Sequence, residues 1–161
     1  MGYEIDFIAV GEGERSGDAI AIRYGNLFGP RSEQMVITID GGTRESGEAL
    51  VEHIKRYYNT SQVDIAILTH PDNDHASGMR SILNLLTVRQ VAMHLPWNHS
   101  SSVKELLDDG RVTSNSIREH TKANLTAAKE IYDLAVEKGI QVVEPFAGQT
   151  NGSGLLSLIH I

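Results

Sequence analysis

The fold is decided by one stretch of the sequence, VDIAILTHPDNDH, which spans residues 63–75. Its first half, Val63–Leu68, is an almost continuous apolar run, which predicts a short strand buried on both faces. Its second half places two imidazoles, two carboxylates and an amide within the six residues 70–75. A helix is predicted from Ala76 to Leu86, so the polar segment follows a buried strand directly. A loop anchored at both ends in this way can hold short side chains convergent.

The residue types of this loop are those of a metal site. His70, Asp72 and Asp74 alternate along it, and His75 follows Asp74. If the loop curls, alternate positions can serve two metal ions about 3.5–4 Å apart, which share a bridging hydroxide and stabilise a leaving oxygen. The simpler alternative is a polar turn in which Asn73 or Asp74 caps the following helix. A calcium loop is excluded, because the glycine and the distal glutamate of an EF-hand are missing from their places.

Composition limits the remaining possibilities. A chain of 161 residues with 40% hydrophobic and 22% charged residues is expected to form a single globular domain over residues 1–161. No apolar run is long enough to span a membrane, and the first ten residues lack the basic region of a signal peptide. The absence of cysteine excludes disulfides and thiolate nucleophiles, and a formal charge of −7 argues against a broad nucleic-acid-binding face. We expect a cytoplasmic protein without a membrane segment.

The order of predicted elements indicates an α/β fold with a mixed sheet. Alternation of Ile5 and Phe7 with Glu4 and Asp6 predicts a half-buried first strand. Three strands come first, and strands then alternate with helices, which favours an α/β sandwich. Strands are expected over residues 3–10, 18–24, 34–39, 63–68, 88–94, 141–144 and 155–159. Helices are expected from about Ser46, over 76–86, over 101–107 and over 116–138.

Three motifs together resemble one known family. The segment Thr69–His75, with Gly78 after it, resembles the His-x-His-x-Asp-His signature of the metallo-β-lactamase superfamily, with Asp72 in place of the usual second His. That variant resembles the branch containing the metallo-hydrolase domain of the bacterial competence (DNA-uptake) channel protein. Residues 10–20 resemble that branch's Val-Gly-x-Gly-Asp-Ala motif with an insertion at 14–16, and residues 37–42 resemble the superfamily's strand ending in Ile-Asp-x-Gly.

The resemblance implies a fold, a cofactor and roles for individual residues. The fold would be the metallo-β-lactamase-like αβ/βα sandwich, of which this chain would supply the N-terminal half. His70 and Asp72 would bind one divalent metal ion, and Asp74 and His75 a second. Asp74 would also be the catalytic residue that orients the attacking water. Because Asp72 replaces a softer His, manganese or iron joins zinc as a candidate metal.

The resemblance also implies a reaction. A metal-bound hydroxide would attack the substrate, and the competence-type branch favours a phosphodiester in a nucleic acid or nucleotide. A lactam or thioester hydrolase is the alternative enzyme. The superfamily's later His, bridging Asp and final His have no counterpart here, so we expect the N-terminal part of a larger enzyme, apparently truncated at the C-terminus. A non-catalytic module that pairs with another chain, as a homodimer through the apolar residues 155–161, is therefore also open.

The other histidines carry weaker predictions. His94 ends a predicted strand at His94-Leu95-Pro96-Trp97 and His99 follows, so either could complete a metal site, and Trp97 could stack on a base. His53 and His120 are expected to be solvated on amphipathic helices, and His160 lies near the chain end. The glycines at 11, 13 and 17 do not form a dinucleotide fingerprint, because the third comes one place late and a strand follows.

Overall fold

One mixed sheet organises the chain, as seen in a computed structural model that describes residues 1–11, 17–99 and 114–146, with no side-chain placement for 114–122. Within these ranges six strands are hydrogen-bonded in chain order. β1, β2 and β3 pair antiparallel, and β3 to β6 pair parallel. The strands are β1 (Gly2–Phe7), β2 (Ile20–Gly25), β3 (Gln34–Ile39), β4 (Gln62–Ile67), β5 (Thr87–Ala92) and β6 (Gln141–Val143).

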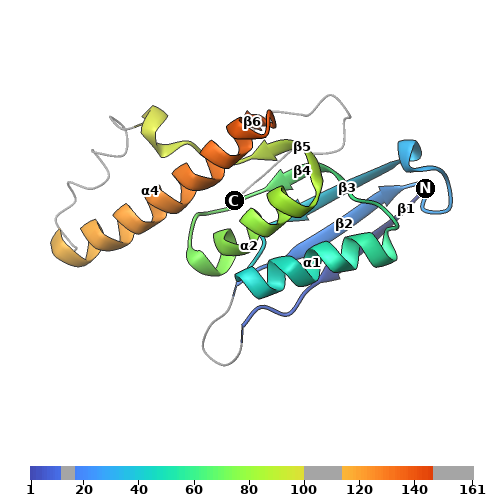
Figure 1. Cartoon of the computed structure of the whole chain (residues 1–161), viewed down its shortest axis with the longest axis horizontal. Helices are drawn as coiled ribbons and strands as arrows, with labels where there is room; N and C mark the ends of the chain where they lie inside the picture. The colour runs from blue at the N-terminus through green and yellow to red at the C-terminus, as the bar shows by residue number, and fades with distance from the viewer. Residues whose placement is uncertain (12–16, 100–113, 147–161) are drawn as a thin grey trace.

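The helices described lie on one side of this sheet (Figure 1). They are α1 (Arg44–Tyr57), α2 (Asn73–Leu85) and α4 (Ser114–Glu137). Two short 3-10 turns are also described, η1 (Arg31–Glu33) between β2 and β3 and η2 (Pro96–His99) after β5. Because α1 and α2 each connect two parallel strands, the loops that follow β3 and β4 meet at the same edge of the sheet. This edge carries the polar segment 69–75.

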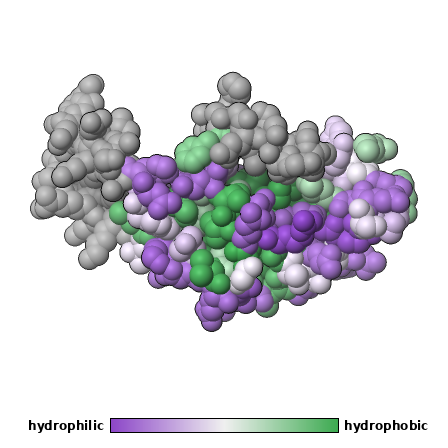
Figure 2. All heavy atoms as spheres, turned by 90° about the horizontal axis from the view of Figure 1, so that it is seen from above, coloured by the Kyte–Doolittle hydropathy of each residue, from purple (hydrophilic) through white to green (hydrophobic). Residues whose placement is uncertain are grey.

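Two apolar clusters hold the layers together, one on each face of the sheet. Since side chains alternate along a strand, Val36 and Ala66 face the helices while Ile37 and Ile65 face the other way. The helix-side cluster is the larger and takes in Leu50 of α1 together with Ile82 of α2 and Ile131 of α4. On the molecular surface, hydrophobic residues gather in the middle of the face seen in Figure 2, with hydrophilic residues alongside.

α2 approaches the loop between β3 and α1 so closely that a side chain would not fit between them. A Cβ built on Gly78 of α2 would lie 1.9 Å from the carbonyl oxygen of Gly41. The amide of Gly78 donates to Gly42 O, and the amide of Gly41 donates to His75 O, both over 2.9 Å. These contacts fix the start of α2 against the loop that follows β3.

Most predicted elements are confirmed, with shifted ends. The strand over 34–39 has the predicted bounds, and β4 begins one residue earlier than predicted. The helix predicted from Ala76 begins at Asn73, because the amides of His75 and Ala76 already donate to Asp72 O. The N-cap is therefore Asp72, not Asn73 or Asp74 as the alternative reading proposed. The helix predicted over 101–107 and the strand over 155–159 lie outside the described residues.

The first strand differs more strongly from its prediction. β1 ends at Phe7 instead of Val10, and its apolar side chains Tyr3, Ile5 and Phe7 are 73%, 47% and 74% exposed. The acidic side chains of the strand point toward the helix layer instead. This orientation is tolerated because each carboxylate has a partner, and Glu4, for example, forms an ion pair with Arg23.

Asp6 of β1 is held by two side chains of the α1 region. The Tyr58 hydroxyl donates to Asp6 over 2.6 Å, and His53 Nε2 lies 3.1 Å from the same oxygen. Burial, the hydrogen bond to Asp6 and the charges of Asp6 and Glu4 all raise the pKa of Tyr58, so its hydroxyl keeps its proton. The prediction that His53 is solvated is wrong, because its side chain packs at this contact and is 20% exposed. The His120 side chain lies outside the described residues.

No described helix combines the length and the hydropathy that crossing a membrane would require.

Candidate metal centre

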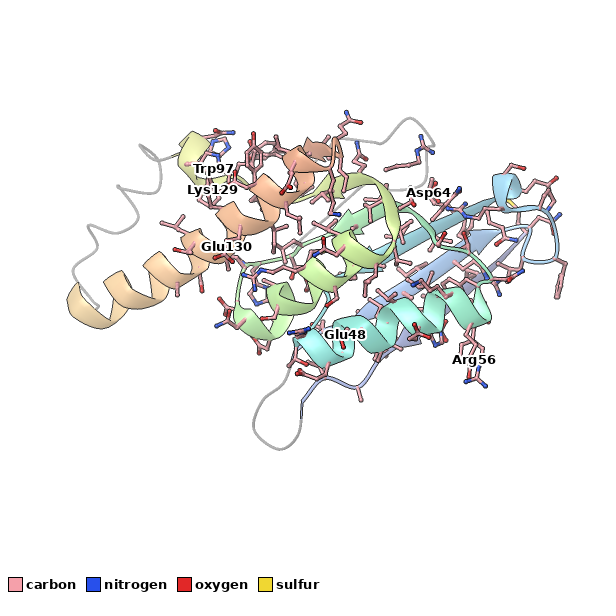
Figure 3. The ribbon with its side chains drawn as sticks, in the orientation of Figure 1. Glu48, Arg56, Asp64, Trp97, Lys129 and Glu130 are labelled. Carbon is pink, nitrogen blue, oxygen red and sulfur yellow. The ribbon has the colours of Figure 1, made fainter. Side chains whose placement is uncertain are left out.

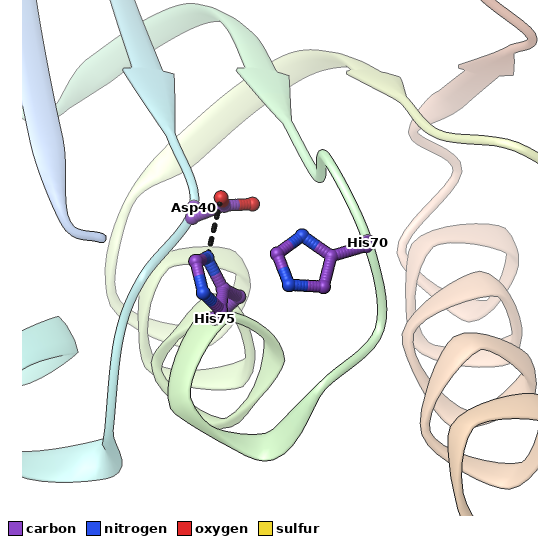
Figure 4. A group of neighbouring side chains, drawn as sticks. All are labelled: Asp40, His70 and His75. Carbon is purple, nitrogen blue, oxygen red and sulfur yellow. Dashed lines mark hydrogen bonds and ion pairs between the residues drawn. The ribbon is translucent and has the colours of Figure 1, made fainter. Parts of the chain in front are cut away.

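The candidate site lies at the carboxyl ends of two neighbouring parallel strands, β3 and β4. Asp40 follows β3 directly, His70 lies two residues after Leu68, and His75 is in the first turn of α2. One ligand atom from each of these three side chains lies within 4.8 Å of the other two. Figure 4 shows the two imidazoles and the carboxylate facing one another across this edge. Among the described residues, this is the group of His, Asp and Glu side chains placed to hold a metal ion.

Asp40 is the buried centre of the group. Its side chain is 1% exposed and accepts three hydrogen bonds, from the Thr69 amide to Oδ1 over 2.8 Å, from the Thr69 hydroxyl to Oδ2 over 2.5 Å and from His75 Nδ1 to Oδ2 over 2.9 Å. Its backbone has a φ of 54°, which a non-glycine residue seldom adopts and which is common at functional sites. Because both oxygens already accept hydrogen bonds, the contacts favour an orienting role for Asp40 over direct metal binding.

The hydrogen bond to Asp40 decides which nitrogen His75 offers. With Nδ1 donating to the carboxylate, the unprotonated nitrogen of a neutral His75 is Nε2. A carboxylate behind a metal-binding imidazole is a common arrangement, since it fixes the ring and increases its basicity. His70 lies beside it, with the ring centroids 3.9 Å apart at an interplanar angle of 47°. The donor set therefore suits a divalent transition metal.

Asp72 lies next to His70 in a geometry that suits a shared ion. Its Oδ2 lies 3.8 Å from His70 Nε2. Two ligands of one tetrahedral ion, each with a bond of about 2.1 Å, are about 3.4 Å apart, so a small movement would bring both into contact with the same metal. The other oxygen, Oδ1, accepts a hydrogen bond of 2.5 Å from Asn124 of α4.

Asp74 occupies a different position from the other predicted ligands. Its carboxylate does not belong to the group defined by Asp40, His70 and His75. It lines a surface hollow of about 680 Å³ between the first turns of α1 and α2, whose other lining residues are Thr43, Arg44, Glu45, Asn73 and Ser77. Asp74 therefore follows the metal group closely in sequence, but it lines this hollow and does not belong to the group.

Gly17 and Asp18, which precede β2, lie against the start of α2. A Cβ on Gly17 would lie 1.9 Å from the backbone oxygen of Asp74, so only glycine allows the loop to pack this closely on the start of α2. The next residue, Asp18, brings its carboxylate to 3.9 Å from His75 Nδ1. The Gly-Asp-Ala motif and the 69–75 segment, far apart in sequence, therefore meet in the fold.

The histidines predicted as possible completing ligands lie elsewhere among the described residues. His99 Nε2 contacts Glu144 over 3.0 Å, and His94 packs against Phe146 at a ring distance of 5.6 Å. Burial raises the pKa of Glu144, but hydrogen bonds from the Leu95 amide, Asn98 and His99 outweigh it and lower that pKa overall. This cluster follows β5 and β6 and is separate from the group around His75.

Trp97, which is labelled in Figure 3, is partly buried in η2. Its ring lies 5.4 Å from that of Tyr132 in α4. Trp97 therefore packs against the helix-side cluster, and base stacking by its ring stays a prediction.

Two residues of the site were missed by sequence reasoning. Asp40 is part of the segment 37–42 that resembles the Ile-Asp-x-Gly motif, but no role was predicted for it. A carboxylate placed directly after a predicted strand could have indicated it. Asn124 had no signal in the sequence, because its contact with Asp72 spans 52 residues.

Comparison with known proteins is consistent with this geometry. No curated protein matches the chain. The family model described as the metallo-beta-lactamase superfamily matches residues 31–159, which include β3, β4 and the whole 69–75 segment. The six-stranded mixed sheet with its helices agrees with that fold. The chain therefore belongs to the metallo-beta-lactamase superfamily.

Proposed function

We propose that the protein is a metal-dependent hydrolase that uses the segment 69–75 as its metal-binding loop. The observation that carries this proposal is the arrangement around Asp40, in which a buried carboxylate orients His75 while His70 and Asp72 lie beside it with a ligand-like spacing. Superfamily membership supports the same reaction class. A buried carboxylate is costly unless it is hydrogen-bonded, and the donors that satisfy Asp40 are the His75 ring and Thr69, both in the proposed loop.

Each side chain of the loop has a proposed role. His70 and Asp72 bind one divalent ion, and His75 with Asp74 binds a second. For Asp74 this requires its carboxylate to move toward His75, because it is not among the side chains that already converge. When bound, such ions would generate a nucleophile from water at neutral pH and stabilise the leaving group. Asp74 would accept a hydrogen bond from the attacking water and hold it in line, while Asp40 keeps the His75 ring in place.

The substrate class rests on the sequence motifs. The Gly-Asp-Ala segment, which packs against the start of α2, and the aspartate at position 72 resemble the competence-type branch and favour a phosphodiester in a nucleotide or nucleic acid. The formal charge of −7 would oppose an anionic substrate, but two divalent ions at the site would offset it locally. Zinc and manganese are the candidate metals, since the proposed ligands combine imidazole nitrogen with carboxylate oxygen.

Substrate panels test this proposal. The chain, loaded with zinc or manganese, is assayed with bis(p-nitrophenyl) phosphate, a chromogenic cephalosporin and a chromogenic thioester. We expect turnover of the phosphodiester, reduced by about two orders of magnitude or more in His70→Ala. The matched control is His99→Ala, which removes a histidine outside the metal group and leaves turnover unchanged.

The other outcomes would replace the proposal. Turnover of the cephalosporin or thioester alone would establish the alternative enzyme class. Metal binding without turnover of any substrate would favour the non-catalytic module, and light scattering would then test the predicted homodimer. Loss of activity in His99→Ala, with His70→Ala unaffected, would contradict the proposed ligands.

A further inference from the structure

The Thr69 hydroxyl lies between the buried Asp40 carboxylate and the His70 ring. It is 2.5 Å from Asp40 Oδ2 and 2.9 Å from His70 Nδ1. A hydroxyl has one proton to donate, and a carboxylate can only accept. The Thr69 proton therefore points to Asp40, in a short charge-assisted hydrogen bond.

This direction determines the tautomer of His70. Because the Thr69 proton is committed to Asp40, its oxygen can only accept from His70 Nδ1. A neutral His70 then carries its proton on Nδ1 and its lone pair on Nε2. Nε2 is the atom that lies 3.8 Å from Asp72 Oδ2, where the proposed ion would sit.

We propose that Thr69 is a positioning residue that passes the orienting effect of Asp40 to His70. One buried carboxylate would then set the tautomers of both imidazoles, directly at His75 and through the Thr69 hydroxyl at His70. The backbone supports this arrangement, since the Thr69 amide donates to Asp40 Oδ1 and holds the threonine in register with the carboxylate. This inference rests on the proposed metal-binding function of the same loop.

Two variants separate the hydroxyl from the shape of the side chain. Thr69→Val keeps the branched shape without the hydroxyl, and Thr69→Ser keeps the hydroxyl without the methyl group. The first measurement is the set of ¹⁵N shifts of the His70 ring in the metal-free protein, at about pH 8, where imidazoles are largely neutral. We expect the proton on Nδ1 in the wild type and in Thr69→Ser. In Thr69→Val it should move largely to Nε2.

The second measurement is the affinity for Zn²⁺ by competition with a chelating dye. Loss of a hydrogen-bond partner behind a metal-binding histidine lowers metal affinity about 10- to 100-fold, which we expect for Thr69→Val, with Thr69→Ser close to the wild type. Far-UV circular dichroism confirms that each variant is folded. If Thr69→Val is not folded, the ¹⁵N shifts of the wild type and Thr69→Ser still test the inference. A His70 ring protonated on Nε2 in either protein would overturn it.

The outcomes distinguish this inference from the proposed function. If the wild type does not bind Zn²⁺ but carries the His70 proton on Nδ1, the proposed function is contradicted. The positioning of His70 by Asp40 through Thr69 is then still supported. If the wild type binds Zn²⁺ and a folded Thr69→Val has the same His70 tautomer and the same affinity, the inference about Thr69 is overturned. The proposed metal-binding function is then still supported.

Discussion

Replacing Gly78 with alanine tests how tightly the start of α2 is held against the loop after β3. The added Cβ would lie 1.9 Å from the Gly41 oxygen and 2.5 Å from the Thr43 oxygen, both of them backbone atoms. Contacts of this kind are normally about 3.5 Å, so the two segments must separate by about 1.5 Å. Overpacking of this type costs about 1–3 kcal/mol.

Two further contributions set the expected magnitude. Separation weakens the hydrogen bonds from Gly78 N to Gly42 O and from Gly41 N to His75 O, each worth about 1 kcal/mol. Alanine in a helix interior contributes about 1 kcal/mol in the other direction. We therefore expect Gly78→Ala to lower the free energy of unfolding by about 2–4 kcal/mol.

Urea unfolding followed by circular dichroism measures this change. The matched control is Asn84→Ala, an exposed position of the same helix, where the gain in helix propensity should raise stability by a few tenths of a kcal/mol. If Gly78→Ala is instead stabilised like the control, the close approach of α2 to the loop after β3 does not exist as described. Because His75 O takes part in this contact, the variant should also bind Zn²⁺ more weakly.

Three other changes have defined outcomes. Asp40→Asn replaces a carboxylate that accepts three hydrogen bonds, so the free energy of unfolding measured in urea should fall by about 1–3 kcal/mol. The affinity for Zn²⁺, measured by dye competition, should fall as well. Asn124→Ala removes the donor to Asp72, so the affinity for Zn²⁺ should fall about 10-fold with little change in urea unfolding. The pKa of Glu144 is lower in the folded protein than its ordinary value of 4.5, so the stability it contributes is present above that value and lost as pH falls through the folded pKa. Urea unfolding between about pH 6 and pH 3 should therefore show a smaller acid-induced loss for Glu144→Gln than for the wild type.

Each of these predictions has a contradicting result. An Asp40→Asn protein as stable as the wild type would show that the carboxylate is not the buried acceptor described. Unchanged Zn²⁺ affinity in Asn124→Ala would mean that α4 does not position Asp72. A stability difference between wild type and Glu144→Gln that stays constant with pH would show that its hydrogen bonds do not favour the charged carboxylate.

The sequence predicts best where local pattern and burial agree. The run at 63–68 could be recognised as a buried strand because both of its faces are apolar, and the polar residues after it lie at the sheet edge as expected. The start of α2 was placed three residues too late, since residues 73–75 are polar and carry no helical periodicity. The helix starts there because the Asp72 carbonyl accepts the first amides.

Long-range contacts explain the larger differences. The orientation of β1 was ambiguous because apolar and acidic side chains alternate, and only the partners at Arg23 and Tyr58 put the acids on the helix side. Asp40 and the 69–75 segment are separated by a helix and a strand. Their contact depends on the parallel pairing of β3 with β4, which local periodicity does not specify.

The number of metal ions bound per chain tests the proposed two-metal site without reference to any substrate. The protein is purified without chelator, equilibrated with Zn²⁺ or Mn²⁺, and its metal content is measured by elemental analysis for the wild type, Asp74→Ala and His75→Ala. We expect close to two ions in the wild type and about one fewer in each variant. A wild type that retains no metal, or variants that keep the full wild-type content, would contradict it.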